Sequence, residues 1–176
     1  MEIGKNFYQY QIEALLSEND ISRSFLGKHL SLARKVRILQ IKKNLLETEN
    51  QKIQLRTIAR QSALLEHSHI QLLHDYLETS EGIFFIYEYL EGESLENFLK
   101  KKPAEKIRKD IFVQILDALA YSHRQGVVHL NLNPKKILIN QRGEAIVTGF
   151  GFAVFEQGQS NFTSPEQKQN EYTDAR

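Results

Sequence analysis

The sequence has no cysteine, no tryptophan and only three prolines in its 176 residues. The absence of cysteine excludes disulfides and thiolate metal sites, and it is typical of proteins that work in the reducing cytosol. Long hydrophobic runs are also missing, since none approaches the ~20 residues of a membrane span. Residues 1–5 begin no signal-peptide core. We therefore expect a soluble, cytoplasmic protein with no membrane partner.

An excess of charge of either sign is absent too. The 23 lysines and arginines nearly balance the 22 aspartates and glutamates, which leaves a formal net charge of +1. Such a chain has no global field that would attract nucleic acid, so no nucleic-acid partner is expected. A hydrophobic content of 41% is enough for the core of one domain or of two small lobes.

The first half of the chain is patterned as short strands around one helix. Alternating or β-branched runs predict strands at residues 7–12, 24–27, 36–41, 70–77 and 82–90. From about residue 48 to 65, apolar residues recur at spacings near three and four, which is typical of a helix. This stripe consists of Ile53, Leu55, Ile58, Ala59 and Ala63.

The second half changes to helical patterning after a hinge at residues 88–92. A short helix is predicted at residues 95–99 and a long one at residues 104–125, which Gly126 ends. The long helix repeats an apolar residue every four positions, and three further apolar residues flank that row. The row is Ile107, Ile111, Ile115 and Leu119, and the flanking residues are Phe112, Leu116 and Ala120.

Several local signatures in this order resemble those of protein kinases. The run HLNLNPKKILI at residues 129–139, followed by VTGFGFA at 147–153, resembles H-R-D-L-K-P-x-N followed by D-F-G. Further matches are LEHSHI at 65–70, YEYLEGESL at 87–95 and ALAYSHRQGVVH at 118–129. By this resemblance the chain is identified as a degenerate member of the protein kinase superfamily, similar to Ser/Thr kinases.

The resemblance implies an α+β, protein-kinase-like fold. Residues 1–90 would form a five-stranded antiparallel small lobe with one helix, and residues 91–176 an incomplete, mainly helical large lobe. Residues 161–167 resemble the A-P-E segment, after which the family's next helix would follow, so we expect a C-terminally truncated domain. The helix at 104–125 would then lack its usual cover. This surface predicts a protein partner or self-association.

Three catalytic positions of the family are occupied by residues that cannot do its chemistry. Asn131 stands where an aspartate acts as the base, and an amide is not basic at neutral pH. Gly149 replaces the metal-binding aspartate of D-F-G, and Lys136 replaces the asparagine that holds the second metal. The resemblance therefore implies that no catalytic residue is intact and that no metal is bound.

The glycine-rich loop that covers the phosphates is degenerate as well. Its three glycine positions correspond to Ser17, Asn19 and Ser22. The lysine that pairs with the phosphates corresponds to Leu39, and its glutamate partner on the helix corresponds to Ile58. The charge clamp would thus become an apolar contact, which can be neutral or stabilising for the fold.

The adenine pocket of the family would be lined here by Arg37, Tyr87 and Leu138, and Leu138 is expected to belong to the core. Strand alternation puts Arg37 on the same face as Leu39. The guanidinium either fills the adenine pocket or snorkels to solvent, and both interpretations stay open.

Histidines at 67, 69 and 74 could suggest a metal site. Two of them belong to the kinase-like loop at residues 65–70 and the third lies on a predicted strand, so no metal is expected there. His129 and Phe150, by contrast, match two packing residues of the family.

The leading hypothesis is a catalytically inactive, truncated pseudokinase that serves as a protein-binding or regulatory module in signalling; a remnant without selected activity is a close version of it. The alternative is an atypical ATP-dependent protein Ser/Thr kinase with weak or metal-independent nucleotide binding, in which Lys136 substitutes for a metal and Asn131 orients the acceptor. A third hypothesis is one module of a longer chain. No cofactor is expected under the first hypothesis, and ATP and Mg²⁺ only under the alternative.

Overall fold

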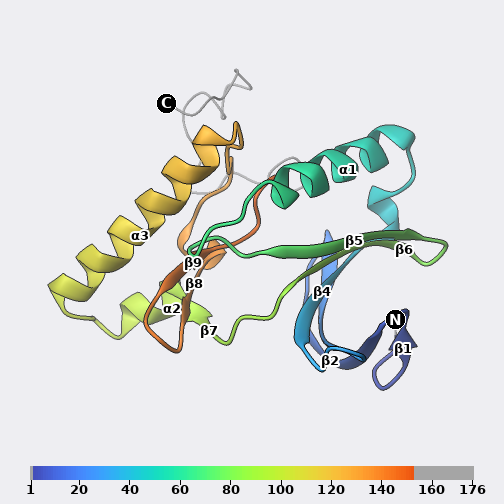
Figure 1. The fold of residues 1–176 in the computed structure, drawn as a ribbon, viewed down its shortest axis with the longest axis horizontal. Coiled ribbons are helices and arrows are strands. Elements are labelled where there is room, and N and C mark those ends of the chain that lie inside the picture. The colour runs from blue at the N-terminus through green and yellow to red at the C-terminus, as the bar shows by residue number, and fades with distance from the viewer. Residues whose placement is uncertain (1, 153–176) are drawn as a thin grey trace. The chain divides into compact units, whose positions relative to one another are not determined.

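The computed structural model describes residues 2–152, which form two compact units (Figure 1). The first unit comprises Met1–Ala63 and Leu72–Leu90, and the second comprises Leu64–Gln71 and the chain from Glu91 onward. Residues 64–71 thus belong to the second unit, although they fall inside the range 1–90 assigned to the small lobe. The A-P-E-like segment at 161–167 lies outside the described residues.

The first unit is a curled antiparallel sheet with one helix. Its strands follow the order β1-β2-β3-β4-β6-β5, so β6 lies between β4 and β5. The strands are β1 (Asn6–Phe7), β2 (Tyr10–Glu18), β3 (Ser22–His29), β4 (Lys35–Ile41), β5 (Leu73–Thr79) and β6 (Gly82–Glu88). A 3-10 turn η1 (Lys43–Leu45) precedes helix α1 (Glu49–Ala63). The helix and five strands are present as predicted elements, but the first predicted strand, residues 7–12, is divided: β1 ends at Phe7, the chain turns at Tyr8 and Gln9, and β2 begins at Tyr10.

One predicted strand begins too early. Residues 70–77 were expected to be extended throughout, but β5 starts at Leu73. The reason is that Ile70 makes an isolated bridge to Val147, and the Gln71 amide donates to the Val147 carbonyl at 2.9 Å. This pairing ties the start of the predicted strand to the second unit.

The sheet of the first unit buries side chains on both faces. One face carries the cluster Phe7, Tyr10, Ile12, Phe25, Val36, Ile38, Phe84 and Ile86. From α1, the buried residues are Leu55, Ile58, Ala59 and Ser62. The spacing correctly predicted the helix, and of the residues in the predicted stripe Leu55, Ile58 and Ala59 are buried whereas Ile53, at 52%, and Ala63 are exposed.

The second unit combines two helices with a small sheet. It contains β7 (Gly92–Ser94), α2 (Leu95–Lys100), α3 (Glu105–Arg124), the 3-10 turn η2 (Pro134–Lys136), β8 (Ile137–Asn140) and β9 (Ala145–Val147). The sheet order is β7-β8-β9 and both pairings are antiparallel. The Ser94 hydroxyl caps α2 by accepting from the Asn97 amide at 3.3 Å. Both predicted helices are confirmed.

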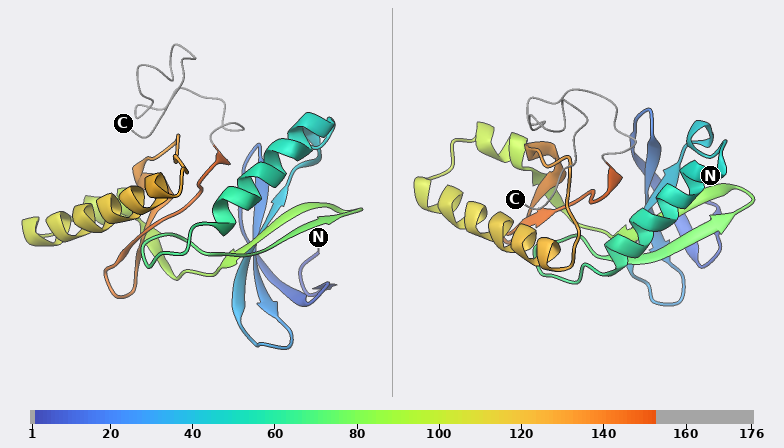
Figure 2. Two further views of the ribbon diagram at one scale, coloured as in Figure 1. Left: turned by 45° about the horizontal axis from the view of Figure 1, so that its top comes forward. Right: turned by 90° about the horizontal axis from the view of Figure 1, so that it is seen from above.

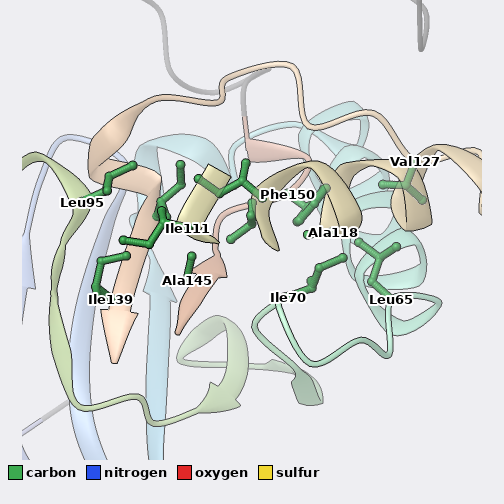
Figure 3. Packing of buried hydrophobic residues seen from close by; sticks show 12 residues of the cluster. Leu65, Ile70, Leu95, Ile111, Ala118, Val127, Ile139, Ala145 and Phe150 are labelled. Carbon is green, nitrogen blue, oxygen red and sulfur yellow. The ribbon is translucent and has the colours of Figure 1, made fainter. Parts of the chain in front are cut away.

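The core of the second unit lies between α3, β8, β9 and the segment at 64–71 (Figures 1, 2 and 3). It consists of Leu65, Ile70, Leu95, Ile111, Ile115, Ala118, Val127, Ile137, Ile139, Ala145, Val147 and Phe150. Figure 3 shows Ile111 and Ala118 of α3 among these side chains. Within residues 2–152, no helix is both long and apolar enough to cross a membrane.

The row of apolar residues predicted on α3 does not follow the buried face. Ile111 and Ile115 are buried as expected, but Ile107 is 43% exposed. A spacing of four residues turns 40° beyond a full helical turn at every step, so a long row of this kind leaves the core face. The buried positions instead continue at Ala118 and Ser122.

Candidate active site

The catalytic-loop histidine of the resemblance is a packing residue in the second unit. His129 is 2% exposed, and its ring centroid lies 4.6 Å from that of Phe150. Its Nε2 lies 3.0 Å from the carbonyl oxygen of Thr148, which indicates that Nε2 carries the proton. The histidine thus joins the loop after α3 to the loop after β9, and its predicted role as a packing residue is confirmed.

The loop at 131–135 is held by the side chain of Asn133. Its Nδ2 donates to the Asn131 carbonyl at 3.1 Å, and its Oδ1 accepts from the Lys135 amide at 3.0 Å. Leu130 takes a φ of 62°, which is uncommon outside glycine and marks a constrained loop. The bonds of Asn133 fix the backbone around Asn131; that Asn131 stands at the position of the catalytic base stays a prediction from the sequence, and its amide is not basic.

Lys136 and Gly149 lie side by side because a short backbone pairing joins their segments. The amide of Thr148 donates to the Lys136 carbonyl at 2.8 Å, and the Thr148 hydroxyl donates to the same oxygen at 3.1 Å. A Cβ atom placed on Gly149 would lie 3.3 Å from Cδ and 3.6 Å from Nζ of Lys136. The lysine stem and its ammonium thus lie beside Gly149, and a side chain at this position would contact them.

This pair offers a divalent cation a poor site. Magnesium takes oxygen ligands in near-octahedral geometry, whereas Gly149 has no side chain and Lys136 supplies a cation. Within residues 2–152, no three His, Cys, Asp or Glu side chains are grouped so that they could hold a metal. The ammonium of Lys136 instead places a positive charge of the protein beside Gly149.

The loop that corresponds to the glycine-rich loop is a tight turn closed by Asn19. Its Oδ1 accepts from the amides of Ile21 and Ser22 at 2.9 and 2.8 Å, and its own amide donates to the Ser22 carbonyl at 3.0 Å. Ser17 is paired with Ser24 in the β2–β3 ladder. Three backbone amides of this turn, those of Asn19, Ile21 and Ser22, are therefore already bonded inside it.

Arg37 projects from β4 into a polar cluster of the first unit. Its Nε donates to the Ser24 hydroxyl at 2.8 Å. Burial lowers the pKa of Arg37, and the nearby Tyr87 acts in the opposite direction. Burial also raises the pKa of Tyr87, while Arg37 and a hydrogen bond with Ser62 oppose this shift. Arg37 is therefore partly buried and bonded within the first unit, and the interpretation that it fills the adenine pocket stays a prediction.

The remaining predicted positions are apolar. Leu39 and Ile58 are 8% and 4% exposed, so both are buried in the first unit, and their direct contact stays a prediction. Leu138 was expected in the core, which is wrong: it is only partly buried, whereas its strand neighbours Ile137 and Ile139 belong to the core cluster. Strand alternation turns Leu138 to the other face, where it packs against Gly92.

The histidines have structural partners. His67 stacks on Tyr121 with ring centroids 4.9 Å apart, and its Nε2 lies 3.2 Å from a carboxylate oxygen of Asp117. His69 Nδ1 lies 2.9 Å from the Ala145 carbonyl oxygen. His74 belongs to the other unit, and burial lowers its pKa.

Three residues that shape these sites were missed at the level of sequence. In the sequence, Asn19 was interpreted only as a position that lacks the family's glycine. Asparagine is nevertheless a known turn former, because its side chain accepts hydrogen bonds from backbone amides two or three residues later. Ser24 and Thr148 hold Arg37 and the Lys136 segment, respectively. No local signal identifies these two partners, because their contacts join separate strands and loops.

Comparison with known proteins agrees with this geometry. A model of the protein kinase domain family matches residues 10–173. The chain belongs to the protein kinase family.

Several curated protein kinases are similar to the chain. CBL-interacting protein kinase 1 of Oryza sativa subsp. japonica is 26% identical over 176 aligned residues, which cover 92% of this chain and 38% of that protein. CBL-interacting protein kinase 21 of the same organism is 30% identical, covering 90% of this chain. The carbon catabolite-derepressing protein kinase of Saccharomyces cerevisiae is 26% identical, covering 93%. The chain spans only 27–38% of the length of these relatives.

The fold is likewise that of solved protein kinases. The kinase domain of Mycobacterium tuberculosis PknI matches with a TM-score of 0.80 at 18% identity. The match covers 99% of this chain and 71% of that domain. The predicted protein-kinase-like fold is confirmed, and the chain is a protein kinase domain similar to Ser/Thr kinases.

Proposed function

We propose that this member of the protein kinase family is catalytically inactive and acts by binding another protein. One observation carries the proposal: the side chain of Lys136 packs against Gly149, so a fixed ammonium stands where the family places its metal ligands. Phosphoryl transfer in protein kinases depends on two metal ions, a base and a phosphate-pairing lysine. The residues present here supply none of these groups at the corresponding positions.

The nucleotide half of the first unit supports the same proposal. The turn amides near Asn19 are bonded internally, so they are not free to receive phosphate oxygens. Arg37 takes the place of a small residue beneath adenine and is anchored by Ser24. Leu39 contributes no amine. These changes are independent of one another. They argue that the nucleotide site lacks several functional groups and not just one.

The proposal also covers where the protein acts and what it binds. We propose a cytoplasmic regulatory module in signalling that uses neither ATP nor Mg²⁺ as a cofactor and binds neither nucleic acid nor membranes. Its partner surface is the apolar surface of the second unit. The balanced charge and the absence of cysteine support this setting.

Thermal unfolding with and without ATP, each with and without Mg²⁺, tests the proposal. A ligand at about 100 times its dissociation constant stabilises by ~2.7 kcal/mol, which raises the midpoint of a chain of this size by roughly 5 to 11 °C. We expect a cooperative transition whose midpoint does not change with either addition. An active Ser/Thr kinase domain measured in parallel provides the positive control.

Two results would contradict the proposal and they differ in meaning. A rise that requires Mg²⁺ would mean that a metal–nucleotide site exists despite Gly149. A rise with ATP alone would support the atypical kinase in which Lys136 substitutes for the metal, and a Lys136→Met variant should then abolish it.

A further inference from the structure

Arg37 is a cation of the first unit with no acidic partner among the described residues. It lies on β4 and pairs with Leu26 of β3 and Tyr87 of β6 in the ladder. Its Nε donates to the Ser24 hydroxyl at 2.8 Å. Burial lowers the pKa of Arg37, the neighbouring Tyr87 opposes this shift, and no described carboxylate contributes to it. The guanidinium is thus bonded to a neutral group, and burying a charge in this way is costly.

The strands around Arg37 contain little acid. Neither β3 nor β4 has an aspartate or glutamate, and β6 has only Glu88. Glu88 follows Tyr87, so strand alternation turns it to the opposite face of the sheet from Tyr87 and Arg37. Its Oε1 accepts from the amide of Leu72 at 2.9 Å. No acid of these three strands is therefore placed to neutralise Arg37.

The unused donors of Arg37 reach the surface. A guanidinium has five N–H groups, and the bond to Ser24 uses the one on Nε. The others, on the two terminal nitrogens, have no bond within residues 2–152. In the same part of the chain, the one buried side-chain polar atom without a partner is Oε1 of Gln40. The terminal nitrogens are therefore not sealed in the interior, and the partly buried Arg37 can offer them to a ligand.

The two cross-strand neighbours of Arg37 give its surroundings an apolar side and a fixed side. Leu26 and Tyr87 lie opposite Arg37 in the ladder, so their side chains share its face of the sheet. Leu26 is partly exposed and supplies apolar surface beside the cation. Tyr87 is buried and makes a hydrogen bond with Ser62 of α1. A positive charge thus lies next to a small apolar surface.

We propose that Arg37 binds the carboxylate group of a small organic acid, whose carbon skeleton lies against Leu26. The ligand would supply the negative charge that the Ser24 hydroxyl lacks. Binding would hold the ligand to the first unit without a metal ion or a nucleotide. The inference goes beyond the proposed function and does not rest on it, because it concerns a ligand of the first unit alone.

Two features favour a carboxylate over a phosphate. The terminal nitrogens of a guanidinium form a planar fork that matches the two oxygens of a carboxylate. A phosphate monoester carries close to two negative charges at neutral pH and is best held by several donors. Arg37 is the one charged group described as acting on the neighbouring Tyr87, so a second cation is not at hand. The amides of the Asn19 turn are bonded internally.

Heteronuclear NMR of the full chain, titrated with benzoate, tests the site. The signals to follow are the Nε–H group of Arg37 and the backbone amides of Leu26 and Tyr87. We expect saturable shifts with a dissociation constant on the order of 1 mM, which is typical for so small a ligand. Benzamide has the same shape but no charge, and it should leave these signals unchanged. Inorganic phosphate at the same ionic strength should bind more weakly than benzoate.

Three variants separate the site from nonspecific charge effects. Arg37→Met should weaken benzoate binding more than tenfold, followed at the Leu26 and Tyr87 amides. Arg37→Lys keeps the charge but loses the fork, so binding should weaken by about three- to tenfold. Arg60→Met is the matched control: Arg60 is an exposed arginine of α1, and its loss should leave binding unchanged. The unfolding midpoint of each variant verifies that the fold is kept.

Each outcome bears on the inference. The absence of saturable shifts with benzoate, an equal response to benzamide, or undiminished binding in Arg37→Met would overturn it. Phosphate that binds more tightly than benzoate would overturn the carboxylate as the ligand class. Benzoate binding that Arg37→Met removes supports the inference even if ATP raises the unfolding midpoint, so the proposed function and this site can fail separately.

Discussion

Gly149 and Lys136 illustrate how single residues change the chemistry of a site whose backbone is kept. Gly149 has a φ of 83°, a left-handed conformation that asparagine and aspartate tolerate better than most residues. The backbone could therefore carry an aspartate at this position. The obstacle is Lys136, whose Cδ lies 3.3 Å from the site of the missing Cβ. Gly149 offers no oxygen ligand, and the side chain of Lys136 lies beside it.

Restoring the two aspartates should not restore phosphotransfer. The variant Asn131→Asp with Gly149→Asp regains a base and one metal ligand, but Lys136 remains beside the metal position and Leu39 supplies no amine. We expect no incorporation of labelled phosphate from ATP into a generic protein substrate. Incorporation of phosphate that disappears when residue 131 alone is changed back to asparagine would show that the nucleotide pocket is competent.

Replacing Arg37 by methionine should not destabilise the first unit. Burial disfavours the charged form of Arg37, and its one described hydrogen bond is to the neutral Ser24 hydroxyl. Burying a charge without an ionic partner is costly, so an apolar residue of similar volume removes that cost and offsets the lost hydrogen bond to Ser24. Urea unfolding should give a free energy of unfolding within about 1 kcal/mol of the unmodified chain, or higher.

Arg37→Lys serves as the control for this exchange. It keeps the charge but lacks the planar guanidinium that reaches Ser24, so it should be less stable than Arg37→Met. The opposite ranking would mean that Arg37 has an anionic partner which stabilises its charge.

At the scale of secondary structure elements, the β2–β3 hairpin depends on its turn. Ile12 pairs with Gly27 and Glu18 with Arg23, with irregular register between Ile12 and Ala14. A Cβ on Gly27 would lie 2.7 Å from Cδ1 of Ile38, so a larger residue at this position would force the Ile38 side chain to shift. The Asn19 turn then fixes where the hairpin reverses.

Asn19→Ala should destabilise the hairpin measurably. The variant loses two hydrogen bonds to backbone amides, each with a net value of about 0.5–1.5 kcal/mol. Solvent partly compensates at this exposed turn, so we expect a loss of about 1 kcal/mol in the free energy of unfolding. Asn19→Asp keeps an acceptor oxygen and should lose less. Equal losses in the two variants would argue against the turn bonds as the cause.

The contact between α1 and β5 should weaken at low pH. Arg56 donates to both carboxylate oxygens of Glu78 at 2.6 and 2.8 Å, and Tyr76 donates to one of them at 2.8 Å. The hydrogen bond with Arg56 is the main cause that lowers the pKa of Glu78. Because the folded-state pKa is depressed, this stabilisation is present above the unfolded pKa near 4.5 and is lost as pH falls through the lower folded value.

Glu78→Gln should therefore reduce stability at neutral pH and leave a shallower decline on acidification. Urea unfolding at a series of pH values down to the acid limit of folding measures both effects. Glu13, an exposed carboxylate on β2 in the same unit, provides the control as Glu13→Gln. Identical acid profiles for the Glu78 variant and the unmodified chain would exclude the carboxylate as a source of the acid dependence.

At the scale of the whole molecule, the sequence predicted which segments form strands and helices better than it predicted which segments pack together. Strands and helices were predictable because their periodicities are local. The assignment of residues 64–71 to the second unit was not, since it depends on Val147 pairing with His69 and Gln71 across some 75 positions of the chain. The assignment of the substituted positions rests on the motif alone and stays a prediction. The packing of Lys136 on Gly149 and the bonding of Arg37 to Ser24 required the folded structure.

Leu39 also affects whether the protein can be detected by chemical labelling. Reagents that inventory nucleotide-binding enzymes by acylating the lysine beside the phosphates need an amine at this position. Leu39 offers none, and its side chain is 8% exposed. This chain is therefore expected to remain unlabelled by such reagents at that position.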